Sequence, residues 1–339
     1  MTATIATTTG SPSAILSLGA YRPERVVTNE EICQRIDSTD EWIRTRSGIR
    51  SRRFAAEGES VVDMATVAGR KAIEASGLAV EQIDCIIMAT SSHYNQTPQS
   101  STQVADRLGM KNPGSFDLSA GCAGFCHGLA VASDLIRAGS TKHVLLIGVE
   151  NMSVGLDMTD RGSAFIFGDG AGAVVVGPSE TVEVGPVVWG SDGSQAHAIQ
   201  QLPTWMDIVI NDDYRRPALH MEGQPVFRWA AFSMGKAARQ ALDAAGVTVD
   251  DLDAFIPHQA NQRITEVIVH SLKVPETVPV ADDIEVTANT SAASIPLAME
   301  AMLREGKAPA GGLALLLGFG AGLAFAGQVV RLPKTPVRS

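Results

Sequence analysis

The chain has 339 residues, 45% of them hydrophobic, so it is long enough to bury more than one large core. Its 37 acidic and 27 basic residues give a net charge of −10, which argues against a nucleic-acid partner. The longest apolar stretch, Gly311 to Gly327, is broken by glycines and predicts a buried strand-loop-strand, not a membrane span. Four cysteines without paired spacing, and no expected secretory leader, predict a cytoplasmic protein.

The first elements along the chain are typical of an α/β protein. Residues 1–12 are rich in Thr and Ala, and we expect them to form a disordered tail. From Arg70 the sequence predicts an amphipathic helix, followed by an apolar strand that ends at Ala89-Thr90. We find no metal-spaced His/Cys cluster and no dinucleotide or P-loop fingerprint, so the sequence predicts neither a metal nor a nucleotide cofactor.

Small residues surround Cys122 in the segment DLSAGCAGF, and a helical apolar pattern begins at Phe125. A cysteine at the start of a helix meets unpaired N–H groups and the positive end of the helix dipole, which favour the thiolate. Cys122 is therefore a candidate nucleophile, although taken alone it fits a small core residue equally well. Cys126, one helical turn further on, fits the core better.

The same order of elements recurs in the second part of the chain. The segment from Arg70 matches the segment from Arg239 at an offset of 239 − 70 = 169 residues. At this offset Cys122 aligns with Ser291, and the strand that begins at Val144 aligns with Leu313. We therefore predict two similar halves, residues 13–184 and 215–339, packed about a pseudo-twofold axis. The irregular segment 185–214 is interpreted as an insertion that roofs a substrate tunnel.

Two polar residues of the second half accompany the cysteine. His258 follows the apolar run that ends at Pro257, where an α/β sheet places reactive groups. Asn289 lies in a small-residue turn, which alone would indicate a helix cap. The repeat places this turn opposite the Cys122 turn, so we expect the thiol, imidazole and amide to share one site.

These segments resemble the thiolase superfamily and, within it, the β-ketoacyl-acyl-carrier-protein synthase III family. The resemblance covers nearly the whole chain and implies an α/β, thiolase-like fold whose two pseudo-symmetric halves form five layers, α-β-α-β-α. Its markers are DEWIRTRSGI from Asp40, AGCAGF around Cys122, DRGSAFIFGDGAGAVVV from Asp160, HQANQRI at His258 and NTSAAS at Asn289.

The resemblance implies an acyltransferase that condenses an acyl-CoA primer with malonyl-acyl-carrier protein and so initiates fatty-acid synthesis. Cys122 would carry the acyl group, and His258 and Asn289 would donate hydrogen bonds to the thioester oxygen of the malonyl group. The backbone N–H groups of Cys122 and Ala321 would form the oxyanion hole, with Ala321 where relatives have glycine. Acyl-CoA is then a substrate, and no resident cofactor is expected.

The same resemblance assigns the binding residues of a homodimer. The loop around Thr97 would reach across the dimer interface and leave room for primers longer than acetyl. Ala288 replaces a glycine and would narrow the malonyl side of the pocket. The implied residues are Trp42, Arg46, Arg161 and Asn261 for CoA, Arg263 and Arg228 for carrier-protein docking, and Thr97, Phe165 and Phe167 for the acyl pocket.

Two alternatives to the fatty-acid role remain open. The same chemistry would serve a polyketide pathway as its priming ketosynthase, and sequence does not separate these two roles. A non-condensing acyltransferase on the same fold would keep Cys122 and His258 but would not require Asn289.

Overall fold

The computed structural model describes residues 9–211 and 213–335. Most of the expected tail, 1–12, lies outside the described residues, and residues 9–12 contain no helix or strand. The first strand begins at Ser13, where the first half was expected to start.

The first half forms a five-stranded sheet in the order β1-β7-β6-β4-β5. Strand β4 runs parallel to both β5 and β6, whereas β7 is antiparallel to β1 and to β6. The strands are β1 (Ser13–Tyr21), β4 (Cys85–Ala89), β5 (Gly114–Leu118), β6 (Val144–Glu150) and β7 (Gly170–Pro178).

The second half forms a four-stranded sheet in the order β11-β12-β13-β8. Strand β11 is parallel to β12, and β13 is antiparallel to both β12 and β8. The strands are β8 (Val188–Ser191), β11 (Ala254–Pro257), β12 (Leu313–Gly320) and β13 (Ala324–Arg331). Because β8 is part of this sheet, the segment 185–214 is only partly an insertion.

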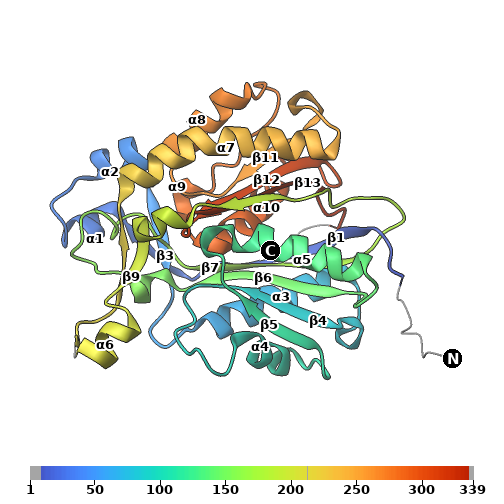
Figure 1. Ribbon diagram of the computed structural model, residues 1–339, viewed down its shortest axis with the longest axis horizontal. Coiled ribbons are helices and arrows are strands. Elements are labelled where there is room, and N and C mark those ends of the chain that lie inside the picture. Colours follow the sequence, from blue (N-terminus) through green and yellow to red (C-terminus); the bar gives the residue numbers. More distant parts are fainter. Residues whose placement is uncertain (1–8, 212, 336–339) are drawn as a thin grey trace.

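Helices separate and cover the two sheets (Figure 1), as the predicted α-β-α-β-α order requires. One pair covers the outer face of the first sheet, one pair lies between the sheets, and one pair covers the outer face of the second sheet. These pairs are α3 (Val61–Ser76) with α4 (Ser100–Leu108), α5 (Gly124–Arg137) with α10 (Ser294–Arg304), and α7 (Gly223–Ala245) with α8 (Gln262–Leu272).

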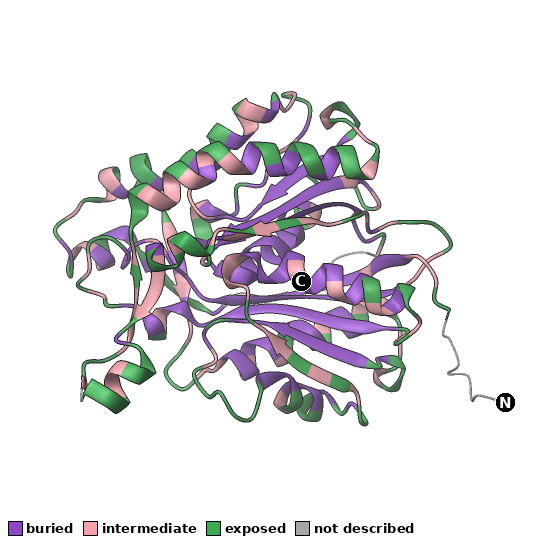
Figure 2. Cartoon of the chain, in the orientation of Figure 1, coloured by how far each residue is buried: buried purple, intermediate pink, exposed green. Residues whose placement is uncertain are grey.

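Side chains on both faces of the inner strands are buried. In β6, Val144 and Leu146 face the central helices, whereas Leu145 and Ile147 face α3 and α4. Burying each such side chain contributes about 1.5–3 kcal/mol, which makes this strand a central source of stability. Figure 2 shows the same contrast, because the inner strands and central helices are buried while the outer helices and the edge strand β5 carry exposed positions.

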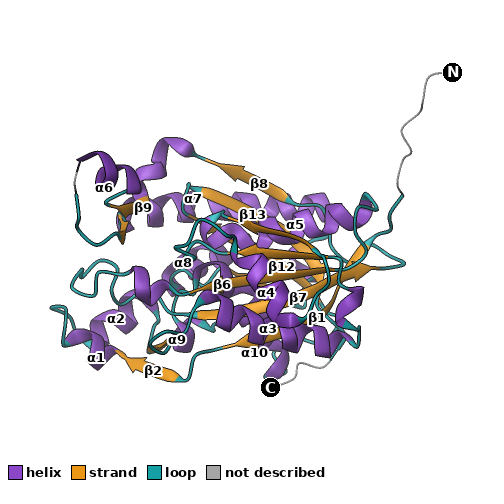
Figure 3. Ribbon diagram, turned by 90° about the horizontal axis from the view of Figure 1, so that it is seen from below, coloured by secondary structure: helices purple, strands orange, loops and turns teal. Residues whose placement is uncertain are grey.

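The remaining elements gather mainly at one end of the sheets (Figure 3). They include the elements that precede α3 and those of the segment between the halves. They are β2 (Arg25–Thr28), α1 (Asn29–Cys33), α2 (Asp40–Ser47), β3 (Ser51–Phe54), β9 (Ile199–Leu202), α6 (Trp205–Asn211), β10 (Ala218–Met221) and α9 (Ile284–Thr287). Short 3-10 turns lie at Val80–Gln82, Gly121–Ala123, Met152–Gly155, Gly193–Ala198, Val249–Asp251 and Ser291–Ala293.

The two halves repeat each other with one inserted residue. Strand β4 matches β11 at the expected offset of 169 residues. Their partner strands differ: Cys85 of β4 pairs with Val144 of β6, whereas Ala254 of β11 pairs with Ala314 of β12. Strands β6 and β12 therefore match at an offset of 314 − 144 = 170 residues. The turns agree with 170, since Gly121 and Ser291 both have a left-handed φ, of 51° and 48°. The predicted alignment of Cys122 with Ser291 is therefore wrong by one residue, because a gapless comparison does not detect one insertion.

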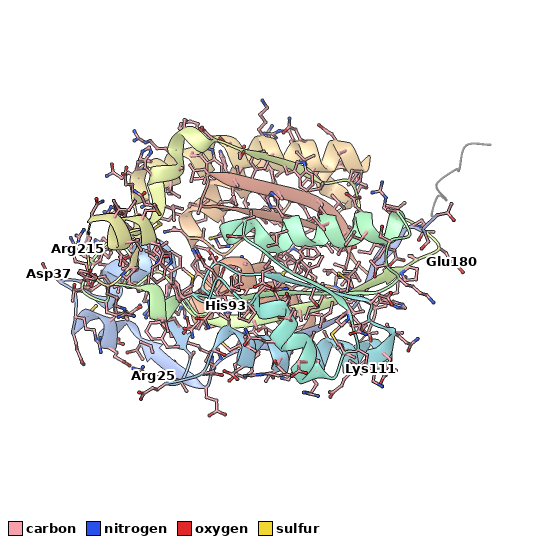
Figure 4. All side chains as sticks on the ribbon, turned by 60° about the horizontal axis from the view of Figure 1, so that its bottom comes forward. Arg25, Asp37, His93, Lys111, Glu180 and Arg215 are labelled. Carbon is pink, nitrogen blue, oxygen red and sulfur yellow. The ribbon has the colours of Figure 1, made fainter. Side chains whose placement is uncertain are left out.

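Within the described residues, no helix combines the length and apolar character needed to cross a bilayer. Charged side chains such as Arg25 and Lys111 lie at the rim of the molecule (Figure 4). His93 lies on the loop between β4 and α4, which also carries the exposed Thr97.

Candidate active site

Cys122 lies in the sharp turn between β5 and α5, as the small residues around it predicted. Gly121 makes the turn possible by adopting φ 51°. Gly320, at the end of β12, packs directly on the cysteine: a Cβ there would lie 2.8 Å from Cys122 Cβ and 2.9 Å from Sγ. The backbone of the second half therefore approaches the thiol closely.

The structure brings Cys122, His258 and Asn289 to one cavity of about 320 Å³. Each comes from a different segment, namely the turn before α5, the end of β11 and the turn before α10. The rest of the lining is largely apolar, and it includes Met152, Ile166, Phe167, Ile199, Leu219, Met221, Val226, Phe227, Ile264 and Phe319. Such a cavity suits an acyl chain bound next to a few polar groups.

His258 is held rigidly at the carboxyl end of β11. Its Nδ1 lies 2.6 Å from the Ser294 hydroxyl, and its ring packs edge-on against Phe319 with centroids 5.3 Å apart. Burial lowers the pKa of His258 to about 3, so the ring is neutral at ordinary pH. When Ser294 donates to Nδ1, the ring proton resides on Nε2, which is then a hydrogen-bond donor.

Asn289 is fixed through its backbone and its amide oxygen. Its N–H donates to the Ile166 carbonyl at 2.9 Å, and its carbonyl accepts from Gly168 at 3.0 Å. The side-chain Oδ1 accepts from the Ser291 N–H at 2.8 Å. The amide NH₂ is consequently the part of the side chain left to donate a hydrogen bond into the cavity.

The cysteine is less acidic than its position at a helix start predicted. Burial raises the pKa of the Cys122 thiol to about 11, against the lowering effect of the Ser291 side chain. The charge of Glu150 raises this pKa as well, whereas the backbone N–H groups of Cys122 and Ala321 lower it. Desolvation of the charged form thus outweighs the helix N-terminus. Both N–H groups thus favour negative charge at this position, and Ala321 is not among the residues with a positive φ that would strain an alanine.

Sequence reasoning missed a buried carboxylate beside this cysteine. Glu150, the last residue of β6, is completely buried and accepts a hydrogen bond from the Ser291 hydroxyl at 2.9 Å. Burial raises its pKa. An acidic residue that ends the otherwise apolar strand Val144–Glu150 is the signal that could have identified it.

Trp42 and Arg161, the expected adenine-binding pair, lie in direct contact. The Arg161 guanidinium lies 4.9 Å from the centre of the Trp42 ring, and that of Arg46 lies 5.8 Å from it. Phe165 meets the same indole edge-on at 5.4 Å between centroids. A purine would enter between Trp42 and Arg161 only if the two side chains moved apart.

The expected acyl-pocket residues separate in the structure. Phe167 lines the cavity at Cys122, whereas Phe165 packs on Trp42 and is not among the lining residues. Thr97 lies on an exposed loop and is not among them either. Ala288 also lies outside the lining and belongs to an apolar cluster with Phe165, so it does not narrow this cavity directly.

The remaining expected binding residues surround the start of α8. Asn261 lines the cavity, and its side chain caps the helix by accepting from the Arg263 N–H at 2.9 Å. The Arg263 guanidinium lies 5.6 Å from the Phe227 ring centre. Arg228 is exposed on α7. Arg228 on α7 and Arg263 on α8 therefore both lie on the outer helices near the cavity.

Two α/β halves that meet at a cysteine turn and an asparagine turn define the thiolase-fold class of acyltransferases. Comparison with known proteins specifies the family. Family models for 3-oxoacyl-[acyl-carrier-protein (ACP)] synthase III and for its C-terminal part match residues 116–193 and 242–332. The mycobacterial β-ketoacyl-[acyl-carrier-protein] synthase III of Mycolicibacterium paratuberculosis is 55% identical over 330 residues, 97% of this chain and 98% of the relative. The chain belongs to the β-ketoacyl-[acyl-carrier-protein] synthase III family.

Solved structures agree with this membership. A priming β-ketosynthase from a polyketide biosynthetic pathway is 48% identical, with a TM-score of 0.95 and coverage of 98% of this chain and 99% of that one. The 3-oxoacyl-(acyl carrier protein) synthase III of Pseudomonas aeruginosa is 36% identical, with a TM-score of 0.88 over 96% of this chain and 99% of that one. The predicted thiolase-like fold is confirmed.

Proposed function

We propose that the protein condenses an acyl-CoA primer with malonyl-acyl-carrier protein, releasing carbon dioxide and forming a 3-ketoacyl-acyl-carrier protein. The observation that supports this most is the convergence of Cys122, His258 and Asn289 on one largely apolar cavity. A thiol that carries an acyl group and two neutral donors beside it are the parts that a decarboxylating condensation requires.

The first half-reaction is acylation of Cys122. Its sulfur attacks the primer thioester, and the carbonyl oxygen becomes a tetrahedral oxyanion. The N–H groups of Cys122 and Ala321, two residues that line the cavity, would donate to that oxyanion. Collapse of the intermediate expels coenzyme A and leaves the acyl group on Cys122. No resident cofactor takes part, because acyl-CoA supplies the acyl group as a substrate.

The second half-reaction uses His258 and Asn289. Loss of carbon dioxide from the malonyl group puts negative charge on the thioester oxygen, which His258 Nε2 and the Asn289 amide would stabilise by donating hydrogen bonds. A neutral imidazole suits this role, since the cavity buries the ring and Ser294 holds its other nitrogen. The carbanion then attacks the acyl carbonyl, and Cys122 is released.

Substrate binding is proposed to use the outer end of the cavity. Trp42, Arg46 and Arg161 form a cationic and aromatic cluster suited to a purine and its phosphates. Asn261 lines the cavity together with His258, where it would hold the pantetheine. An acidic carrier protein would be attracted by the exposed Arg228 and by Arg263, whose guanidinium lies over the Phe227 ring.

We also propose a cytoplasmic homodimer. All four cysteines are free thiols, which suits a reducing compartment. Among the described residues, β5 pairs only with β4, so one edge of the first sheet is open to a second copy. In that arrangement the exposed Thr97 loop, which follows β4, would line the partner's acyl pocket.

A second role with the same chemistry is supported by the 48% identity to a polyketide priming β-ketosynthase. The two roles differ in the primer and in the carrier protein that meet the enzyme. A non-condensing acyltransferase is less well supported, because transfer to an alcohol or amine would leave the Asn289 amide without a function.

One experiment tests the function and separates these roles. The protein is incubated with a panel of acyl-CoA primers and digested, and the Cys122 peptide is examined by mass spectrometry before and after malonyl-acyl-carrier protein is added. We expect acyl-Cys122 that disappears as 3-ketoacyl carrier protein forms, and the preferred primer and carrier distinguish the two pathways. Acylation without condensation would support the transferase, and Cys122→Ala is the matched control.

A further inference from the structure

Glu150 is a buried carboxylate that the proposed half-reactions do not use. It is completely buried, and the hydrogen bonds that the described residues give it all come from neutral donors. Its oxygens accept from the Ser91 N–H at 3.1 Å and from the Ser291 hydroxyl at 2.9 Å. The other donors are the hydroxyls of Thr90, Ser91 and Ser92. A carboxylate without a cationic partner is costly to bury, which indicates a function for its charge.

Ser291 connects this carboxylate to the candidate nucleophile. Its hydroxyl lies 2.9 Å from Glu150 Oε1, and Ser291 lines the same cavity as Cys122, where its side chain lowers the pKa of the thiol. The serine has φ 48°, in the left-handed region that disfavours residues other than glycine, asparagine and aspartate. The Ser291 hydroxyl is thus the group that links the Glu150 carboxylate to the cavity at Cys122, and a strained turn holds it.

His258 is a poor alternative acceptor for the thiol proton. Its pKa is lowered to about 3 by burial, and its Nδ1 is already occupied by Ser294. The pKa of Glu150, by contrast, is raised by burial, which makes the carboxylate more basic than an exposed one. The Glu150 charge raises the pKa of both Cys122 and Tyr94, so the thiolate is favoured only once the carboxylate has taken up the proton.

We propose that Glu150 accepts the thiol proton of Cys122 through the hydroxyl of Ser291. The S–H proton moves to Ser291 Oγ while the Ser291 proton moves to Glu150 Oε1, so a thiolate and a neutral carboxylic acid replace a thiol and a carboxylate. Glu150 is a positioning residue in this scheme, because it acts on the sulfur through Ser291. The inference rests on the proposed function for its role in acylation.

The proton balance closes over the full reaction. The thiolate attacks the acyl-CoA, and the expelled coenzyme A thiolate takes a proton from solvent. Glu150 keeps its proton while the acyl group stays on Cys122. Condensation then releases the Cys122 thiolate, which recovers the proton from Glu150 through Ser291. One proton is consumed for each carbon dioxide released, as the overall decarboxylating condensation requires.

This relay predicts an unusual pH dependence for alkylation of Cys122 by iodoacetamide. Transfer within the pair does not change the number of bound protons, so the thiolate fraction in the wild type is independent of pH wherever the pair holds one proton, and alkylation is followed from about pH 6 to pH 8. In Glu150→Gln the proton has to leave to solvent, and the rate should rise roughly tenfold per pH unit. Ser291→Ala should behave in the same way, because it breaks the path.

The experiment measures alkylation of each cysteine peptide by mass spectrometry over this pH range. Cys33 is the internal reference, and its rate should increase with pH in every variant. Glu150→Asp keeps the carboxylate and should partly restore the flat profile. Asp169→Asn is the matched control, because Asp169 is also buried and accepts from Ser153 and Ala55 but belongs to no path to Cys122.

Single-turnover acylation by an acyl-CoA completes the test. Glu150→Gln and Ser291→Ala should be acylated at least about tenfold more slowly than the wild type at neutral pH, while thermal unfolding shows that they remain folded. A Cys122 alkylation rate in wild type that rises with pH as in Glu150→Gln would overturn the relay. Alkylation needs no acyl substrate, so it tests the relay separately from the proposed function, which fails instead if no primer acylates the wild type.

Discussion

Gly121 and Ser291 occupy the same backbone position in the two halves of the molecule, with φ of 51° and 48°. Each begins the short 3-10 turn that leads into a central helix. Glycine adopts this conformation freely, whereas serine is strained in it. In the first half the absent side chain leaves room for Ala321, whose Cβ would lie 3.2 Å from a Cβ at Gly121. In the second half the side chain is present, and its hydroxyl donates to Glu150 at the cavity that Cys122 lines.

Ala288 is a second strained residue, and replacing it with glycine should stabilise the folded protein. Its φ of 55° and ψ of −159° lie in a region that is essentially confined to glycine. Ala288→Gly should raise the free energy of unfolding by about 1 kcal/mol, because relief of strain exceeds the loss of one buried methyl group. Urea unfolding followed by circular dichroism measures the change.

The control for that substitution is Ala293→Gly. Ala293 is equally buried but has an ordinary φ of −79°, so glycine there should lower the free energy of unfolding. Equal destabilisation by both substitutions would show that the Ala288 conformation is not strained.

Gly320 should be essential for the position of the thiol. The Cβ of an alanine would lie 2.8 Å from Cys122 Cβ and 2.9 Å from Sγ, closer than atoms in contact allow. Gly320→Ala should slow acylation of Cys122 about 100-fold, because displacing a reacting atom by about 1 Å has an effect of that size. Single-turnover mass spectrometry of the Cys122 peptide measures the rate.

Gly193→Ala is the matched control, since no atom lies within 4 Å of a Cβ at Gly193. It should acylate at the wild-type rate. If the Gly320→Ala protein were acylated at the wild-type rate, the turn around Cys122 would be able to shift without displacing the reacting sulfur. That result would contradict the close packing of the two halves at this point.

Local motifs explain how much of the site could be predicted from sequence. Each catalytic candidate lies at the end or the start of a segment whose pattern can be recognised without its neighbours: Cys122, His258 and Asn289. The repeat then places the Cys122 turn opposite the Asn289 turn. Glu150 was not predicted, because its partner Ser291 is 141 residues away and no local pattern links them. The direct stacking of Arg161 on Trp42 escaped as well, since side-chain packing is decided by neighbours that spacing does not reveal.

The burial of Cys122 was also invisible to sequence. A turn of small residues predicted access to the helix N-terminus but not the closeness of Gly320 and the surrounding cavity wall. Desolvation therefore reversed the expected direction of the thiol pKa.

Arg161 and Trp42 should affect binding of CoA rather than the chemistry. Arg161→Ala removes the guanidinium that lies 4.9 Å from the indole centre, and it should raise KM for acyl-CoA about tenfold with little change in kcat. Steady-state kinetics with the matching acyl-pantetheine, which lacks the nucleotide, should show no change. A loss that is equal for both substrates would place Arg161 outside nucleotide binding.

His258 should make the protein sensitive to acid. Its pKa is about 3 in the folded chain against an ordinary value of 6.5, so protonation favours the unfolded state. The corresponding stability is fully present above about pH 6.5 and is lost as the pH falls towards the folded value, by at most about 1.4 kcal/mol per pH unit. Urea unfolding of the wild type and of His258→Gln, measured from pH 7.5 down to about pH 5, should give a shallower pH dependence for the variant.

The exposed His220 supplies the matched control for this comparison, because His220→Gln removes an imidazole from the surface without changing the cavity around His258. The other ionisable groups are the same in all three proteins, so their contributions to the pH dependence cancel. If the wild type and His258→Gln lost stability in parallel, His258 would have to gain a proton without opening the cavity. Burial would then not be what keeps the His258 ring neutral. The hydrogen bond to Ser294 alone would have to hold the proton on Nε2 as a donor.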